Sequence, residues 1–260
     1  MCTRVAPHSS SENKRVQAAL NRQKHARILY DADQLQRPTL SWFDAEYWQH
    51  EQAAESIAGG RGGSSRVHTP VGPAMLKHYR RGGQMARISR DRYLFTGWER
   101  SRSFREWRLL AKLCAMKLPV PEPLTALCCK SGRSYQAALL TRWIEGARPL
   151  HEALQSTDAQ HADGLLQATL QSIQALHAAG VYHPDVNLGN VLVDAADKIW
   201  LIDFDRATLQ VEGSRRHRQS LQRMYARLLR SAQRWQLRGH LPMQHVQRLE
   251  EIVQNPSVEL

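Results

Sequence analysis

The chain has 260 residues, of which 36 are lysine or arginine and 24 are aspartate or glutamate, giving a formal net charge of +12. No apolar run approaches the ~18 residues of a membrane-crossing helix, and the polar N-terminus lacks the apolar stretch of a secretory leader. The four cysteines form no C-x-x-C pair and no zinc-binding spacing, which excludes a disulfide scaffold and a cysteine-ligated zinc site. A protein this basic usually meets an anionic partner, such as nucleic acid, a phosphorylated ligand or a membrane surface.

The positive charge is concentrated in two segments. Residues 213–249 contain nine arginines and no lysine, aspartate or glutamate, and residues 77–108 contain ten basic residues against three acidic ones. The rest of the chain therefore has a small net negative charge. A helix that is merely solvated usually mixes both signs, so residues 213–249 favour an anionic partner.

The first part of the chain begins with residues 1–25, which are polar and predict a mobile tail. Aromatic residues between positions 42 and 48 predict a cluster that packs on the first lobe. Glycines at 59–63 predict a flexible loop. Residues 66–69 and 74–79 then predict two strands on either side of a proline- and glycine-containing turn.

Apolar residues that recur at spacings of three and four predict three helices, over residues 101–117, 163–179 and 215–235. Gly180 directly follows the second helix and is typical of a C-terminal cap. Further strands are predicted over residues 134–143, 191–193 and 199–202. The last two are joined by four residues, which predicts a hairpin.

The chemistry-bearing residues lie around this hairpin. Phosphoryl transfer needs one carboxylate near the attacking hydroxyl, a second that holds Mg²⁺ against the ATP phosphates, and a side-chain carbonyl that completes the metal shell. Asp185 and Asn190 have the D-x-x-x-x-N spacing of a kinase catalytic loop, and Asp203 follows the hairpin where a metal-binding aspartate belongs. Each residue alone fits a turn or a strand end, but the ordered set predicts a kinase.

The residues after Asp203 argue against a peptide substrate. The basic helix follows within about ten residues, and the sequence has no Ala-Pro-Glu anchor for a peptide-binding platform. A small molecule or a lipid-linked sugar needs no such platform. Asp205 replaces the glycine of the usual Asp-Phe-Gly loop, which predicts a fixed metal loop in place of an activation switch.

Two motifs carry a resemblance to a known family. Residues 182–187 read YHPDVN and residues 202–206 read IDFDR, and this pattern resembles the 3-deoxy-D-manno-octulosonic acid (Kdo) kinases among the lipopolysaccharide-core kinases. Five further segments are similar to that family, at residues 60–62, 76–83, 91–95, 102–106 and 118–121. Pro184 and Val186 stand where alanine and leucine are more usual, but neither position supplies a reacting group.

The resemblance implies an α+β, bilobal protein-kinase-like fold. It assigns residues 26–145 to a small β-rich N-lobe with the interlobe hinge, and residues 146–260 to a short helical C-lobe. The implied activity is transfer of the ATP γ-phosphate to the 4-hydroxyl of a Kdo sugar on a lipid A precursor. The implied setting is the cytoplasmic face of a Gram-negative inner membrane, with peripheral contact to the anionic surface, no nucleic acid and no obligate protein partner.

The resemblance also assigns residues to ATP and Mg²⁺. It makes Lys77 the phosphate-binding lysine of the third strand and Glu106 its partner on the following helix. The other implied nucleotide-binding positions are Gly60, Gly62, Gly63 and Glu145. The implied catalytic residues are Asp185, Asn190 and Lys77, and the implied metal ligands are Asn190 and Asp203. His183 fits an orienting role in the catalytic loop or a place in the core.

Three other functions remain open from the sequence: a heptose kinase of the same pathway, a phosphotransferase for a soluble small molecule, and a basic nucleic-acid-binding protein. A nucleic-acid-binding role would leave the Asp185, Asn190 and Asp203 set unexplained. The basic helix presents Arg223, Arg227, Arg230 and Arg234 at spacings of four, three and four. We expect them on one outward face, where they would meet a membrane, guide the acceptor's phosphates or simply be solvated.

Overall fold

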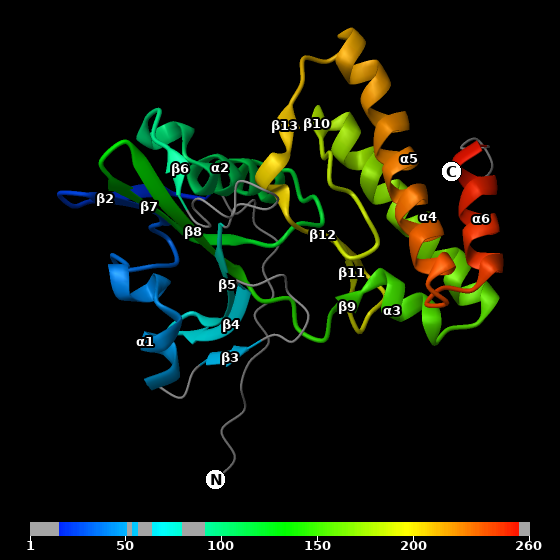
Figure 1. Ribbon diagram of the computed structural model, residues 1–260, viewed down its shortest axis with the longest axis horizontal. Coiled ribbons are helices and arrows are strands. Elements are labelled where there is room, and N and C mark those ends of the chain that lie inside the picture. Colours follow the sequence, from blue (N-terminus) through cyan, green and yellow to red (C-terminus); the bar gives the residue numbers. More distant parts are fainter. Residues whose placement is uncertain (1–15, 51–53, 57–63, 80–91, 255–260) are drawn as a thin grey trace.

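The computed structural model describes residues 16–50, 54–56, 64–79 and 92–254. An antiparallel sheet occupies one side of the molecule and a group of helices the other, so the fold combines strands and helices as expected (Figure 1). The predicted glycine loop at 59–63 lies outside the described residues. The segments at 76–83 and 91–95, which resemble the Kdo kinases, lie partly outside them.

Within the described residues, eight strands form the large sheet: β1 (Ala18–Arg22), β2 (Ala26–Asp31), β3 (Ala54–Ser56), β4 (Ser64–Thr69), β5 (Gly72–His78), β6 (Tyr93–Leu94), β7 (Pro123–Ser131) and β8 (Ser134–Arg142). Their order is β1-β2-β7-β8-β5-β4-β3, and β6 also pairs with β8. The three strands predicted in this part of the chain are confirmed as β4, β5 and β8. Lys77 lies opposite Leu139 of β8 and therefore inside the sheet.

The predicted tail over residues 1–25 is wrong in its last part, because β1 lies within it. Strand β1 pairs with β2 along its whole length, from Ala18 opposite Asp31 to Arg22 opposite Arg27. Strand β2 is held by buried Ile28 and Leu29, and it orders β1 through backbone hydrogen bonds. The five residues of β1 are too few to show a clear strand pattern, and their pairing depends on a strand further along the chain. The sheet consequently starts before the expected boundary at residue 26.

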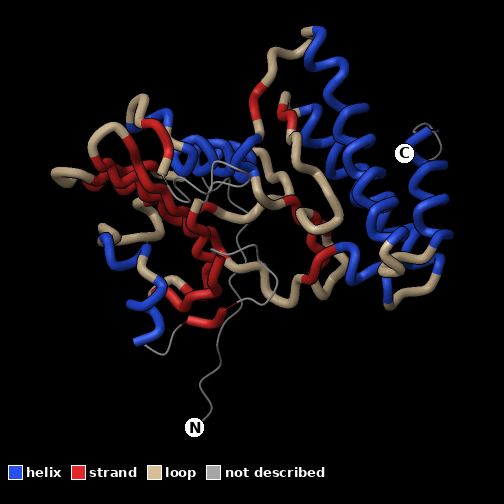
Figure 2. Tube along the Cα trace, in the orientation of Figure 1, coloured by secondary structure: helices blue, strands red, loops and turns tan. Residues whose placement is uncertain are grey.

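Both faces of the sheet are covered, as Figure 2 shows. On one face lies α2 (Arg102–Ala115), preceded by the short 3₁₀ helix η3 (Trp98–Arg100), and α2 buries Phe104 and Trp107. The other face is covered by η1 (Leu40–Phe43) and α1 (Ala45–His50), where Phe43 and Trp48 join the core. The predicted aromatic cluster is thereby confirmed as a cover for the sheet.

The helical side contains α3 (Leu150–Gln155), α4 (Ala159–Ala178), α5 (Arg215–Leu237) and α6 (Met243–Gln254). Short strands lie between them and the sheet: β9 (Arg148–Pro149), β10 (Val181–Tyr182), β11 (Val191–Val193), β12 (Ile199–Leu201) and β13 (Thr208–Leu209), with the 3₁₀ helix η4 (Phe204–Arg206) after β12. The predicted hairpin is confirmed, with Val191 opposite Leu201. Helix α4 starts earlier than predicted because the Asp158 carboxylate caps it, accepting from the His161 N–H at 2.8 Å.

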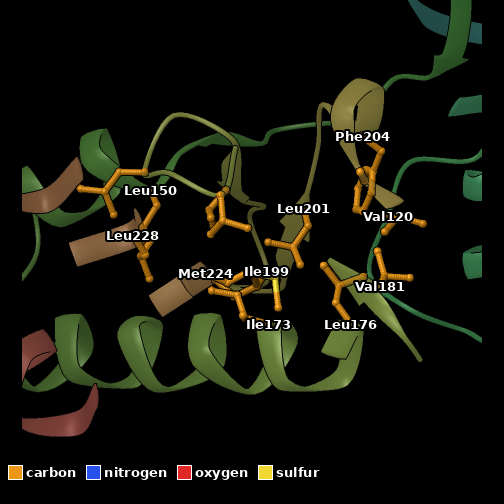
Figure 3. Packing of buried hydrophobic residues seen from close by; sticks show 14 of the residues in the cluster. Val120, Leu150, Ile173, Leu176, Val181, Ile199, Leu201, Phe204, Met224 and Leu228 are labelled. Carbon is orange, nitrogen blue, oxygen red and sulfur yellow. The ribbon is translucent and has the colours of Figure 1, made fainter. Parts of the chain in front are cut away.

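Buried apolar side chains fix the β11–β12 hairpin against the helices (Figure 3). Ile173 and Leu176 of α4 and Met224 of α5 belong to the same buried cluster as Ile199 and Leu201 of β12. Because the hairpin connects Asn190 to Asp203, its packing sets the separation of these two site residues. The same cluster continues through Phe204 into α2 and one face of the large sheet.

Two helix-ending glycines give a test of the local backbone. Gly180 follows α4 with φ +74°, and a Cβ there would lie 3.1 Å from the backbone oxygen of Gln210. Gly239 follows α5 with φ +73°, and a Cβ there would meet nothing within 4 Å. We expect Gly239→Ala to lower the free energy of unfolding by about 1 kcal/mol through left-handed strain alone. Gly180→Ala should cost about 1 kcal/mol more through the close contact, as measured by urea denaturation.

Equal losses in the two variants would contradict this assignment, because the backbone strain is common to both and only the contact with Gln210 differs.

Candidate active site

Three charged residues from distant parts of the chain meet between the sheet and the hairpin. Lys77 comes from β5, Glu106 from α2, and Asp203 lies two residues after the end of β12. The Lys77 Nζ lies 3.1 Å from both carboxylate oxygens of Glu106 and 2.6 Å from Oδ1 of Asp203. The expected pairing of Lys77 with Glu106 is therefore present in the structure, and Asp203 lies beside it.

The Glu106 carboxylate is only 3% exposed and accepts further hydrogen bonds. Its Oε1 accepts from the backbone N–H of Phe204 at 3.1 Å, and its Oε2 accepts from the Tyr79 hydroxyl. A buried carboxylate without such donors would be strongly destabilising. The sequence assigned no site role to Tyr79, which it placed only at the end of a predicted strand, and none to the Phe204 amide, because a backbone donor leaves no sequence signal.

The charges in this group support one another. Burial acts to lower the pKa of Lys77, but the carboxylates of Glu106 and Asp203 outweigh it, and the pKa is raised. Burial acts to raise the pKa of Asp203, but Lys77 outweighs it, and the pKa is lowered. At neutral pH the site therefore presents a fixed ammonium group and a carboxylate, as phosphate and cation binding require.

The catalytic loop is fixed through the backbone of Asp185. Its carbonyl oxygen accepts from the side-chain amides of Asn187 at 2.7 Å and Asn190 at 2.9 Å. Its N–H donates to Nδ1 of His183 at 3.2 Å, and Nε2 of that ring lies 3.0 Å from the carbonyl oxygen of Ile202. Burial lowers the pKa of His183, although the Ile202 carbonyl partly offsets this, so the neutral ring accepts at Nδ1 and donates at Nε2.

The Asp185 carboxylate contacts two arginines that the sequence did not connect with it. Nη2 of Arg227 lies 3.3 Å from Oδ1, and Nη1 of Arg206 lies 3.6 Å from Oδ2. Arg227 was expected on the outward face of the basic helix, and this expectation is wrong. Arg227 precedes the buried Leu228 in α5 and lies at the edge of the helix face that packs on the protein. Its side chain therefore turns toward the loop that carries Asp185.

The metal loop has an unusual backbone and a strong anchor. Asp203 has φ +65° and ψ 61°, a left-handed conformation that aspartate tolerates better than most residues. Two residues on, the Asp205 carboxylate is bound by the Arg102 guanidinium of α2, with Nε 2.6 Å from Oδ1. The Arg102 guanidinium also lies 4.7 Å from the ring centroid of Tyr93. This double anchoring accords with the expected fixed loop.

Comparison with known proteins agrees with this geometry. The model of the "Lipopolysaccharide kinase (Kdo/WaaP) family" matches residues 45–251. The chain belongs to this family.

Curated relatives cover most of the chain. One named 3-deoxy-D-manno-octulosonic acid kinase, from Xanthomonas axonopodis pv. citri (strain 306), is 42% identical over 203 residues, which span 78% of this chain and 80% of the relative. One of the same name from Vibrio parahaemolyticus serotype O3:K6 is 40% identical over 197 residues, which span 76% of this chain and 82% of the relative. A third, from Xanthomonas campestris pv. campestris (strain B100), is 40% identical over 205 residues.

The remaining implied positions of this lipopolysaccharide kinase are only partly described. Gly60, Gly62 and Gly63 lie outside the described residues. Glu145 lies between β8 and β9 with its side chain 75% exposed, and its Oε2 is 3.4 Å from Nη2 of Arg66. A place near the adenine, held through the backbone of this segment, stays a prediction.

The side chains fit a magnesium ion bound together with nucleotide phosphates. No group of three or more His, Cys, Asp or Glu side chains suited to a metal occurs among the described residues. Mg²⁺ in phosphotransferases commonly takes only one or two protein oxygens, with phosphates and water completing the shell. The Ile202 N–H bonds the Asn190 carbonyl at 3.0 Å, so Asn190 lies next to Asp203. Asn190 uses its amide nitrogen toward Asp185, so its amide oxygen is the atom that would face a cation.

The buried position of Glu106 gives a direct test of this site. Glu106→Gln keeps the shape of the side chain but removes the charge that Lys77 and the Phe204 amide face. We expect the free energy of unfolding to fall by about 1–3 kcal/mol, measured by chemical denaturation. The control is Glu99→Gln, an exposed glutamate that pairs with Arg108 and whose loss should cost less than about 1 kcal/mol. A similar decrease in the free energy of unfolding in both variants would show that the buried contacts of Glu106 do not stabilise the fold.

Proposed function

We propose that this chain transfers the γ-phosphoryl group of ATP to the 4-hydroxyl of a Kdo sugar on a lipid A precursor. The observation that carries the proposal is the meeting of the Lys77–Glu106 pair with Asp203, next to a loop that holds Asp185 and Asn190. Family membership supports the phosphotransfer, and the activity named for the relatives supports the acceptor.

In this proposal the molecule has a bilobal, kinase-like layout. The sheet with α2 forms the N-lobe, the helices with the catalytic hairpin form the C-lobe, and ATP lies between them. The interlobe position of the Lys77, Glu106 and Asp203 group, with residues from β5, α2 and the end of β12, supports this layout. The ammonium group of Lys77 would contact the α- and β-phosphates, and Glu106 would hold it in place.

The reaction forms a bond between the acceptor oxygen and the γ-phosphorus and breaks the bond from that phosphorus to the bridging oxygen, which leaves with ADP. The Asp185 carboxylate accepts the hydroxyl proton and orients the attack. Asp203 and Asn190 would hold Mg²⁺, which when bound neutralises charge that develops on the phosphate oxygens. The hydrogen bonds from Asn187 and Asn190 to the Asp185 carbonyl keep this base at a fixed position.

The decisive experiment incubates the protein with ATP, Mg²⁺ and a Kdo-bearing lipid A precursor and follows the acceptor by mass spectrometry. We expect the mass of one added phosphate group, located at the 4-position by fragmentation. Asp185→Asn should lower turnover by roughly two or more orders of magnitude, because it removes the base and keeps the shape. ATP binding should change little in that variant.

Three results would overturn parts of the proposal. Phosphorylation of a heptose-bearing acceptor but not of the Kdo acceptor would make the chain a heptose kinase. Near-normal turnover of Asp185→Asn would remove Asp185 from the role of base. Equal protection of wild type and Asp203→Ala by Mg-ATP against thermal unfolding would contradict the metal assignment.

We also propose that the protein binds peripherally at the cytoplasmic side of the inner membrane, where such an acceptor is embedded. The support is the exposed face of α5, which carries Arg223, Arg230 and Arg234. Basic side chains near an anionic bilayer contribute about 1 kcal/mol each. No described helix combines the length and apolarity needed to cross a membrane.

Liposome sedimentation tests this membrane role. Changing Arg223, Arg230 and Arg234 together to glutamine should weaken binding to anionic vesicles at low salt by roughly tenfold or more. The control variant changes Arg100, Arg105 and Lys112 to glutamine, which removes three exposed charges next to the large sheet. If both variants sediment like the wild type, α5 does not bind the membrane.

A further inference from the structure

Two guanidinium groups converge on the carboxylate that the proposed reaction needs as its base. Arg227 of α5 approaches one oxygen of Asp185 at 3.3 Å, and Arg206 of η4 approaches the other at 3.6 Å. The two arginines come from separate elements that flank the catalytic loop. Their arrangement brings two positive charges to the place where the acceptor hydroxyl has to bind.

These contacts do not hold the loop in place. The backbone of Asp185 is already fixed by His183, Asn187 and Asn190 through its N–H and carbonyl groups. Both contacts to the carboxylate are longer than the ~2.7–2.9 Å of a strong charge-assisted hydrogen bond. The side chains of Asp185, Arg227 and Arg206 are 23%, 36% and 68% exposed. Partly exposed ion pairs of this kind contribute little to stability.

Arg206 and Arg227 also have N–H donors that their contacts with Asp185 do not use. A guanidinium has five N–H donors, and each arginine directs a single contact at Asp185. Within the described part of the chain, the buried Nε of Arg227 has no hydrogen-bond partner. The protein's own groups therefore leave the hydrogen-bonding capacity of this pair largely unused. A second anion beside Asp185 would use it.

The proposed acceptor carries such an anion. An octulosonic acid has a carboxylate on its second carbon, and the 4-hydroxyl lies two carbons further along the same ring. A hydroxyl bound at Asp185 would thus bring the carboxylate to within a few ångströms of the same residue. The planar fork of arginine matches a carboxylate through two parallel hydrogen bonds.

We propose that Arg206 and Arg227 bind the carboxylate of the acceptor sugar while Asp185 receives its hydroxyl; this inference rests on the proposed function. The arginines then select an acidic sugar, because a neutral heptose would leave both guanidinium groups facing only Asp185. They also fix the orientation of the ring, since carboxylate and hydroxyl are bound at the same time. Arg206 and Arg227 therefore determine specificity for the acceptor. Neither takes part in proton transfer, which is assigned to Asp185 alone.

The test compares two acceptors in detergent: the Kdo-bearing lipid A precursor and its carboxamide, which is similar in shape but uncharged. For the wild type we expect the carboxamide to raise the acceptor KM by roughly ten- to a hundredfold, the scale of a lost charged hydrogen bond. The double variant Arg206→Gln, Arg227→Gln should raise the KM of the acid by a similar factor. It should no longer distinguish the acid from the carboxamide, and its KM for ATP should stay unchanged.

The matched control is Arg238→Gln, an exposed arginine at the C-cap of α5. It should discriminate between the acceptors as the wild type does. The variant Arg206→Gln, Arg227→Lys, with lysine in place of glutamine at position 227, should regain part of the discrimination that the double variant loses. Lysine keeps the positive charge but lacks the two parallel N–H donors of a guanidinium group.

Three results would overturn the inference. The first is a wild type that uses acid and carboxamide equally well, a comparison that depends on no variant. The second is a folded double variant that still prefers the acid as strongly as the wild type. The third is a rise in the KM for ATP with unchanged discrimination, which would assign the arginines to nucleotide phosphate. If the wild type phosphorylates neither acceptor, the proposed function itself fails, and the inference fails with it.

Discussion

The arrangement of the site depends on one buried carboxylate. Glu106 comes from the helix that covers the sheet, yet its two oxygens bind Lys77 of the sheet, the Tyr79 hydroxyl and the amide of Phe204 beyond the hairpin. A carboxylate at 3% exposure would be strongly destabilising without such donors around it. The requirement to satisfy Glu106 therefore fixes the distance between the sheet and the metal loop. Lys77 and Asp203 lie side by side as a consequence.

The catalytic loop uses a second, independent set of contacts. A neutral, buried His183 joins the Asp185 amide to the Ile202 carbonyl, so the loop of Asp185 and the segment that carries Asp203 are connected through one imidazole ring. Two asparagine side chains hold the Asp185 carbonyl from the other side. All these hydrogen bonds are made to backbone groups, and the Asp185 carboxylate instead faces Arg206 and Arg227 at longer distances. Stiff backbone and accessible carboxylate together suit a general base.

The sequence was informative where structure is decided locally. Helices α2, α4 and α5 were predicted from apolar spacing, and the β11–β12 hairpin was predicted from two short apolar runs, because burial of one stripe determines each of them. Strand β1 was missed, since its order comes from pairing with β2. Arg227 was placed on the wrong face because four arginines at helical spacing look alike until the packing of α5 is known. Tyr79 and the Phe204 amide became visible only once the chain was folded around Glu106.

The buried apolar cluster has a consequence for cooperativity. It runs without interruption from α2 and one face of the large sheet, through Phe204, to α4, α5 and α6. The sheet has a second buried cluster on its other face, but the cluster at this boundary is shared, so separating the two sides would expose apolar surface on both. Heat or denaturant should then unfold the chain in one transition. If related enzymes exchanged one side of the molecule during evolution, the new side would have to fit this shared apolar cluster. Substitution of single residues at the site would change specificity without disturbing the cluster.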